Sequence, residues 1–110
     1  MKIKSQEIIK GFSPFIVLCI LKKQKMSPYS LMKQIEFISD QKFTLKAPSI
    51  IEILNSLEDE GLVVYCLGKK QKNVPRKIYS ISNKGLQFLD ENQKAIDSYL
   101  DILFKITRGK

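Results

Sequence analysis

A cationic stretch between residues 68 and 77 is the part of the chain best suited to bind a charged group. It reads GKKQKNVPRK and holds basic side chains with no acidic one among them: Lys69, Lys70, Lys72, Arg76 and Lys77. Such a cluster suits ion pairing with phosphates, which releases counterions and requires no particular base sequence. A solvated turn that only prevents aggregation is the alternative interpretation.

The segments on either side of this stretch indicate how it is presented. Residues 62–67 are apolar and β-prone, and residues 78–82 alternate between apolar and polar side chains. Two such segments around a polar stretch predict a two-stranded ribbon. Pro75 lacks a backbone donor, so we expect it at the tip or at the first position of a strand. The basic residues would then project from the end of the ribbon.

The whole chain is basic as well. It has 110 residues, with 19 Lys and Arg against 11 Asp and Glu, and a net charge of +8 at pH 7. This balance favours a polyanionic partner, with nucleic acid ahead of an anionic membrane surface, and simple solubility is the alternative. The length predicts one domain, and domains of this size often gain stability by pairing with a second copy.

Residue types that serve most enzymes and metal sites are scarce. The chain has no histidine and only two cysteines, which disfavours a zinc site and removes the commonest general base. No glycine-rich phosphate loop or nucleophile elbow is present. We therefore expect no enzymatic activity, metal or cofactor. Cys19 and Cys66 are predicted to be small buried residues in a reducing compartment.

The apolar segments are too short for a membrane protein. The longest, residues 15–21, falls far short of the ~20 residues that a membrane-spanning helix needs. No signal-type apolar segment directly follows the basic N-terminal residues. We expect a cytoplasmic protein with no membrane partner.

Proline pairs mark the starts of helices along the first half of the chain. Serine or alanine followed by proline is typical of a first helical turn, and this pattern occurs at Ser13–Pro14, Ser27–Pro28 and Ala47–Pro48. The first of these helices is apolar on all sides up to Lys22, which is typical of a central helix. A separate helical turn is expected around residues 6–10.

The second and third helices are predicted to be amphipathic. Their apolar side chains recur at helical spacing, as Leu31, Ile35 and Ile38 in the second helix and Ile50, Leu54 and Leu57 in the third. Gly61 is well placed to end the third helix. Three short helices followed by a basic ribbon form a winged helix-turn-helix, in which the third helix reads the major groove and the ribbon contacts the flanking backbone.

A long last helix is predicted from Asn83 to about residue 104, capped by Ser82. Its apolar residues follow a seven-residue rhythm, and little of the chain is left to cover them. We therefore expect a second copy to cover Leu89, Ile96, Tyr99, Leu100, Leu103 and Ile106. Packing of Leu86 and Leu89 on the first helix of the same chain is an equal alternative.

These elements define the expected fold class. It is mainly α with a small antiparallel β-ribbon, a winged helix-turn-helix extended by a long C-terminal dimerisation helix. Residues 1–82 would form the DNA-binding region and residues 83–110 the dimerisation helix, within a single structural domain.

Three stretches of the chain resemble the PadR family of winged-helix transcription regulators, over about residues 11–106. The segment LCILKKQKMSPYSLMKQI is similar to the first two helices of the family and matches at Tyr29 and Leu31. The segment APSIIEILNSLEDEGLV is similar to the recognition helix and matches at Leu57, Glu58, Gly61, Leu62 and Val63. The segment RKIYSISNKG is similar to the second wing strand and matches at Arg76, Tyr79, Ile81, Ser82 and Gly85.

The chain also departs from the family pattern. Pro28 stands where glycine is usual, and Ile51 stands where the recognition helix commonly has tyrosine. The chain has no tryptophan, so the drug-stacking pocket of some multidrug-sensing relatives is not supported.

The resemblance implies a homodimer whose recognition helices enter successive major grooves. The expected operator is palindromic, with half-sites about 34 Å apart. We predict a sequence-specific transcriptional regulator, a repressor rather than an activator. The predicted DNA contacts are Tyr29, Ser30, Lys46, Ser49, Glu52, Asn55, Lys69, Lys70, Lys72, Arg76 and Lys77.

Individual roles follow from side-chain chemistry. Glu52 could accept from a cytosine amine and Asn55 could pair with adenine. Arg76 is the best candidate for insertion into a minor groove, and its rival role is a salt bridge to Glu58 or Glu60.

Two other classes of function are open. One is a winged helix that docks on an acidic protein. The other is a small-molecule sensor whose effector sits between the dimer helices, lined by Phe12, Phe15, Tyr99 and Phe104.

Overall fold

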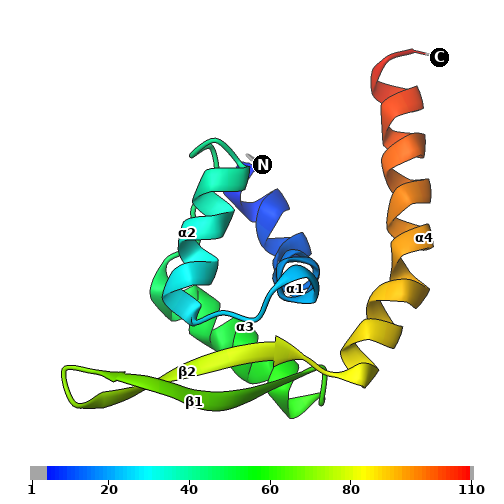
Figure 1. Ribbon diagram of the computed structural model, residues 1–110. Helices are drawn as coiled ribbons and strands as arrows, with labels where there is room; N and C mark the ends of the chain where they lie inside the picture. The colour runs from blue at the N-terminus through cyan, green and yellow to red at the C-terminus, as the bar shows by residue number, and fades with distance from the viewer. Residues whose placement is uncertain (1–4, 110) are drawn as a thin grey trace.

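The computed structural model describes residues 5–109, which form helices and a two-stranded antiparallel sheet in the predicted order. The elements are α1 (Ser5–Lys23), α2 (Pro28–Ile38), α3 (Ala47–Asp59), β1 (Val63–Gln71), β2 (Val74–Ile81) and α4 (Asn83–Thr107). Helices α1 to α3 pack together above the ribbon, and α4 rises on the other side of α1 (Figure 1). This arrangement confirms the expected fold class.

Helix α1 supplies the centre of the core. Its Val17 and Leu18 are completely buried, and they belong to one hydrophobic cluster with Leu31 of α2 and Leu54 of α3. Tyr79 of β2 joins the same cluster. Burial of a tyrosine ring disfavours the phenolate, so the pKa of Tyr79 is raised despite the nearby Lys77. Three helices and the ribbon therefore share a single core.

The start of α1 differs from the prediction. The helix begins at Ser5 and continues through Pro14 without a break, so the expected start at Ser13–Pro14 and the separate turn around residues 6–10 are wrong. A proline inside a helix removes one backbone donor and crowds the preceding turn. The tightly buried residues after Pro14, among them Val17 and Leu18, hold this part of the helix in place by tertiary packing.

Most of the apolar residues predicted to form the buried faces of α2 and α3 are buried in the structure. Ile50, Leu54 and Leu57 of α3 are buried as expected, and Gly61 ends this region with a φ of 76°, a left-handed conformation that suits glycine. In α2 the prediction for Ile38 is wrong, because its side chain is 64% exposed. The helix ends at this residue and the chain then turns away.

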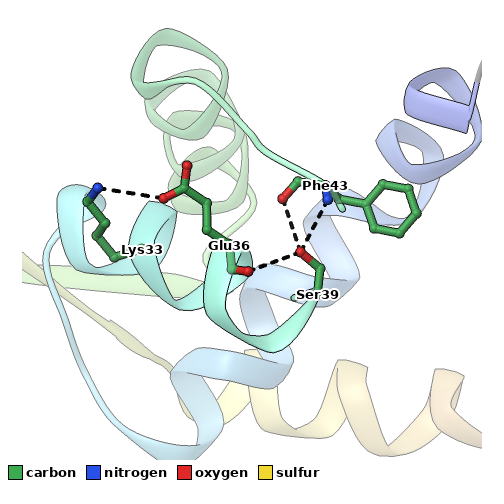
Figure 2. Close-up of polar contacts among 4 residues, drawn as sticks. All are labelled: Lys33, Glu36, Ser39 and Phe43. Atoms are coloured by element: carbon green, nitrogen blue, oxygen red, sulfur yellow. Dashed lines mark hydrogen bonds and ion pairs between the residues drawn. The ribbon is translucent and has the colours of Figure 1, made fainter. Parts of the chain in front are cut away.

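A hydroxyl organises the turn between α2 and α3 (Figure 2). Ser39 Oγ accepts a hydrogen bond from the Phe43 amide at 3.2 Å and lies 3.3 Å and 3.1 Å from the carbonyl oxygens of Glu36 and Phe43. Asp40 and Gln41 adopt positive φ values of 56° and 64°, which reverses the chain within two residues. This turn sets where α3 begins relative to α2.

The ribbon is longer than predicted and its tip is shorter. The register runs from Val63 opposite Ile81 to Gln71 opposite Val74, with an irregularity between Leu67 and Lys70. The connection is the pair Lys72–Asn73, with φ values of 54° and 64°. Two consecutive left-handed residues match the twist of paired strands. Most of the cationic stretch therefore lies in the strands rather than in a loop.

A short segment before α2 extends the ribbon sideways. The Met26 amide donates to the Tyr79 carbonyl at 3.1 Å, and the Tyr79 amide donates to the Met26 carbonyl at 2.9 Å. These two bonds place the N-terminus of α2 beside β2.

Helix α4 starts on the core and then leaves it. Ser82 caps the helix by accepting from the Gly85 amide at 3.0 Å. Leu89 is only 4% exposed and belongs to the core of its own subunit, so its assignment to a dimer interface is wrong: the first turns of α4 pack on α1. Ile96 is half-buried, and the following residues are exposed.

The cysteines differ in exposure. Cys66 was expected to be buried but is exposed on β1, because only one face of the ribbon packs on the helices. Cys19 is half-buried on α1, and burial raises the pKa of its thiol while the neighbouring Lys22 and Lys23 oppose that shift. None of the helices within residues 5–109 has both the length and the apolar character that crossing a bilayer requires.

Candidate nucleic-acid interface

A hollow between α2 and the ribbon brings together several of the predicted contact residues. It has a volume of about 430 Å³ and is lined by Ser27, Pro28, Tyr29, Ser30, Arg76 and Lys77. The first four residues begin α2 and the last two belong to β2. Tyr29, Ser30, Arg76 and Lys77 therefore surround one space, although the two pairs are far apart in the sequence.

Arg76 links the two walls of this hollow. Its Nη2 donates to Ser27 Oγ at 2.9 Å. The same hydroxyl oxygen accepts from the Ser30 amide at 3.2 Å, as the N-cap of α2. Within residues 5–109, Arg76 pairs with neither Glu58 nor Glu60, so the rival salt bridge is wrong. A guanidinium has five N–H donors, so Arg76 can hold Ser27 and an anion at the same time.

The first turn of α2 favours an anion in this hollow. Amides at a helix N-terminus carry partial positive charge, and no acidic side chain lies in this turn. Lys77 and Arg76 add full positive charges on the opposite wall. Polar donors and cations therefore face one space from two elements.

Tyr29 and Lys77 each take part in a cation–π contact. The Lys33 ammonium lies 5.5 Å from the Tyr29 ring centre, and the Lys77 ammonium lies 4.3 Å from the Tyr65 ring centre. Tyr29 is 61% exposed, so it is a surface residue and not a core residue. The contact with Tyr65 restricts the Lys77 side chain while leaving its charge at the surface.

The remaining basic residues of the ribbon are free to bind. Lys69 and Lys70 of β1 and Lys72 of the turn are exposed. Among the residues that the structure describes, none of the three forms an ion pair. Their charge is therefore available to an external polyanion.

Helix α3 presents a different surface. Lys46 precedes it without a side-chain cap bond, Ser49 is half-buried, and Glu52 and Asn55 are exposed. Within its bounds α3 contains acidic residues and no basic one, since its sequence is APSIIEILNSLED. The positive charge on this surface lies on the ribbon and on the exposed Lys46 just before α3, whereas α3 itself offers hydrogen-bonding groups.

The N-terminal end of α3 and the turn of the ribbon lie toward the same side of the molecule. In Figure 1 both point to the left of the view, and α4 stands on the right. This is the arrangement in which one duplex could contact the helix and the ribbon together.

The aromatic residues suggested for an effector site do not gather within one subunit. Phe15 lines an apolar hollow of about 610 Å³ between α1 and α2. Tyr99 and Phe104 lie on the exposed part of α4 and are 66% and 61% exposed. Phe12 is 40% exposed on α1.

Two residues of this surface escaped the sequence analysis. Ser27 was expected only to cap α2, and its bond to Arg76 joins positions that are 49 residues apart, which no local pattern reveals. Ile51 was noted only as a departure from the family and is 47% exposed on α3.

A comparison with known protein families identifies the chain. The model of the transcriptional regulator PadR-like family matches residues 17–91. The chain belongs to the PadR-like family. This membership confirms the resemblance and the expectation of a transcriptional regulator rather than an enzyme.

Solved structures show the same PadR-like fold over nearly the whole chain. A transcriptional regulator from Clostridium thermocellum is 19% identical and has a TM-score of 0.82, with 94% of this chain and 97% of that chain covered. A PadR-like regulator from Bacillus cereus is 21% identical, with a TM-score of 0.81 and coverage of 94% and 99%.

One of the similar structures was solved with DNA bound. Bacillus subtilis PadR in complex with operator DNA is 23% identical, with a TM-score of 0.64, and the match covers 71% of this chain and 45% of that chain. A search of curated protein sequences finds no match.

Proposed function

We propose that this PadR-like protein is a cytoplasmic repressor that binds a palindromic operator as a homodimer. The observation that carries the proposal is the hollow in which Arg76 and Lys77 of the ribbon face the N-terminus of α2. A phosphate of the DNA backbone fits this combination of guanidinium, ammonium and helix N-terminus. The DNA complex of Bacillus subtilis PadR supports the same class of partner.

The elements would divide the work of binding. The exposed Lys69, Lys70 and Lys72 contact phosphates along the flanking backbone, which supplies affinity on any sequence. Helix α3 has no basic residue, so its side chains supply little general affinity and act on base edges. Specificity and affinity therefore come from different parts of the subunit.

Helix α4 provides the argument for a dimer. Tyr99, Leu100, Leu103 and Ile106 are each at least half exposed in the single chain. A row of large apolar side chains on a solvent-exposed helix is typical of an interface. A second copy related by two-fold symmetry would cover this row and present two α3 helices, about 34 Å apart, to one face of the duplex. Residues 1–82 then serve as the DNA-binding region and residues 83–110 as the dimerisation helix.

Selection of bound fragments from random DNA tests the proposal. The purified protein is incubated with a random duplex library at near-physiological salt, and bound fragments are amplified and sequenced over several rounds. We expect an enriched inverted repeat whose half-sites are separated by about one helical turn. Enrichment of no sequence, together with binding that does not weaken as salt is raised, would contradict DNA binding as the function.

A further inference from the structure

Ile51 is a large apolar side chain that the core does not use. It is 47% exposed. Its neighbour Ile53 packs against the hydrophobic core, but Ile51 is not part of that packing. Single exposed hydrophobic residues are common on protein surfaces, so its position on α3 decides what it can do.

The position places Ile51 beside the two polar residues expected to face the bases. At 100° per residue, Ile51 and Asn55 lie about 40° apart around the helix axis and about 6 Å apart along it. Glu52 lies about 60° from Asn55 on its other side. All three side chains are exposed. The outward face of α3 thus carries one carboxylate, one amide and one branched hydrocarbon side by side.

The base edges of the major groove present one apolar group. It is the C5 methyl of thymine, and apolar side chains contact it. An isoleucine suits this contact because its branched Cβ strongly restricts χ1 in a helix, so binding costs little side-chain entropy. The amine and carbonyl groups of the other base edges would instead lose their hydrogen bonds to water if they packed against Ile51.

We propose that Ile51 reads a thymine methyl in the operator and is a specificity-determining residue of this protein. The proposal rests on the function inferred above. Because about 6 Å along α3 corresponds to about two base-pair steps, the thymine would lie within about two base pairs of the base that Asn55 contacts. The operator half-site would therefore contain an essential methyl group close to the Asn55 contact.

Deoxyuridine tests this directly because it differs from thymidine only by the methyl group. Each thymine in one half-site of the selected operator is replaced singly by deoxyuridine, and the dissociation constant is measured for the native protein and for Ile51→Ala. We expect one position at which removal of the methyl weakens binding by the native protein about fourfold, as for one buried carbon. At that position Ile51→Ala should bind both duplexes equally.

Controls separate this contact from other effects. Ile51→Val keeps a branched side chain and should retain most of the response, and Asn55→Ala should weaken binding while leaving the methyl response in place. Because Ile51 is half exposed, its truncation leaves the fold intact, which thermal unfolding checks.

Each outcome has a separate meaning. A native protein that responds to no deoxyuridine substitution, or an Ile51→Ala variant that responds as the native protein does, would overturn the role of Ile51 while DNA binding stands. A protein that enriches no operator at all would overturn both proposals.

Discussion

The Arg76 side chain shows how one residue can serve two elements. Its bond to Ser27 uses one donor and holds the guanidinium against the N-terminus of α2. The expected role for Arg76 was insertion into a minor groove. The bond to Ser27 favours a phosphate contact instead, because it keeps the guanidinium at the wall of the hollow.

Replacing Arg76 with glutamine should therefore remove one phosphate contact. We expect weaker binding on all sequences and a salt slope, log K against log salt concentration, that is smaller by about 0.9. Fluorescence anisotropy at several salt concentrations measures both effects. Lys105→Gln is the matched control, since Lys105 pairs with Asp101 on α4, and it should leave the slope unchanged. An unaltered slope in Arg76→Gln would show that Arg76 does not touch the backbone.

The elements were predictable where local chemistry defines their ends. Ser27 and Ser82 cap the N-termini of α2 and α4 as expected, and Gly61 turns the chain just after the end of α3. These signals act within four residues, so the sequence contains them. The continuation of α1 through Pro14 was not predictable, because burial against the other elements outweighs the local signal of a proline.

The sequence indicated which residue types form the candidate site, but not how the fold brings them together. Lysines and arginine between β-prone segments indicated a phosphate-binding ribbon. The contact of Arg76 with Ser27, and the Met26–Tyr79 bridge that brings α2 beside β2, join distant positions. Such contacts depend on how the elements pack around the core, and the periodic pattern of apolar residues in the sequence does not specify that packing.

Gly85 is required for the junction between α4 and the ribbon. A Cβ at this position would collide with the carbonyl oxygen of Leu62 and crowd the Ile81 side chain. Gly85→Ala should therefore lower the free energy of unfolding by about 2 kcal/mol, the typical cost of overpacking. Denaturation with urea, followed by circular dichroism, measures this change.

Gly11 offers a matched control for that substitution. It lies inside α1, and a Cβ there would meet open space. Gly11→Ala should raise the free energy of unfolding by up to about 1 kcal/mol, the difference in helix propensity. Equal effects of the two substitutions would contradict the close approach at Gly85.

We expect the exposed lysines of the ribbon to bind phosphates as a group. Replacing Lys69, Lys70 and Lys72 with glutamine should weaken binding to operator and to random DNA by a similar factor, because binding to phosphates does not depend on base sequence. The salt slope should fall by up to about 0.9 for each phosphate that the variant no longer neutralises. Titrations of both DNAs measure the ratio of the affinities. A weakening confined to the operator would mean that the ribbon reads bases.

At the scale of the whole molecule, we expect the exposed part of α4 to determine whether two copies of the chain associate. Leu100→Lys and Leu103→Lys place two charges in the apolar row, at positions that are 54% and 52% exposed in the single chain. The subunit should stay folded, and sedimentation equilibrium should give the 12.7 kDa mass of one chain instead of twice that mass.

The control for this double substitution changes the charge by the same amount on the other face of α4. Asp90→Asn and Asp97→Asn remove two negative charges at exposed positions away from the apolar row, and the protein should remain dimeric. A double lysine variant that also sediments as a dimer would place the interface elsewhere.

The separation between an acidic α3 and a basic ribbon also affects how the protein meets a duplex. The negative field of DNA would exert a torque on an approaching subunit, turning the ribbon inward and holding the carboxylates back. While the protein slides along non-specific DNA, its lysines would contact the phosphates and α3 would stay out of the major groove. Helix α3 would enter the groove only where contacts with the base edges compensate this repulsion. Sliding along DNA would then depend on the positive charges of the ribbon, and recognition of the operator on the negative charges of α3.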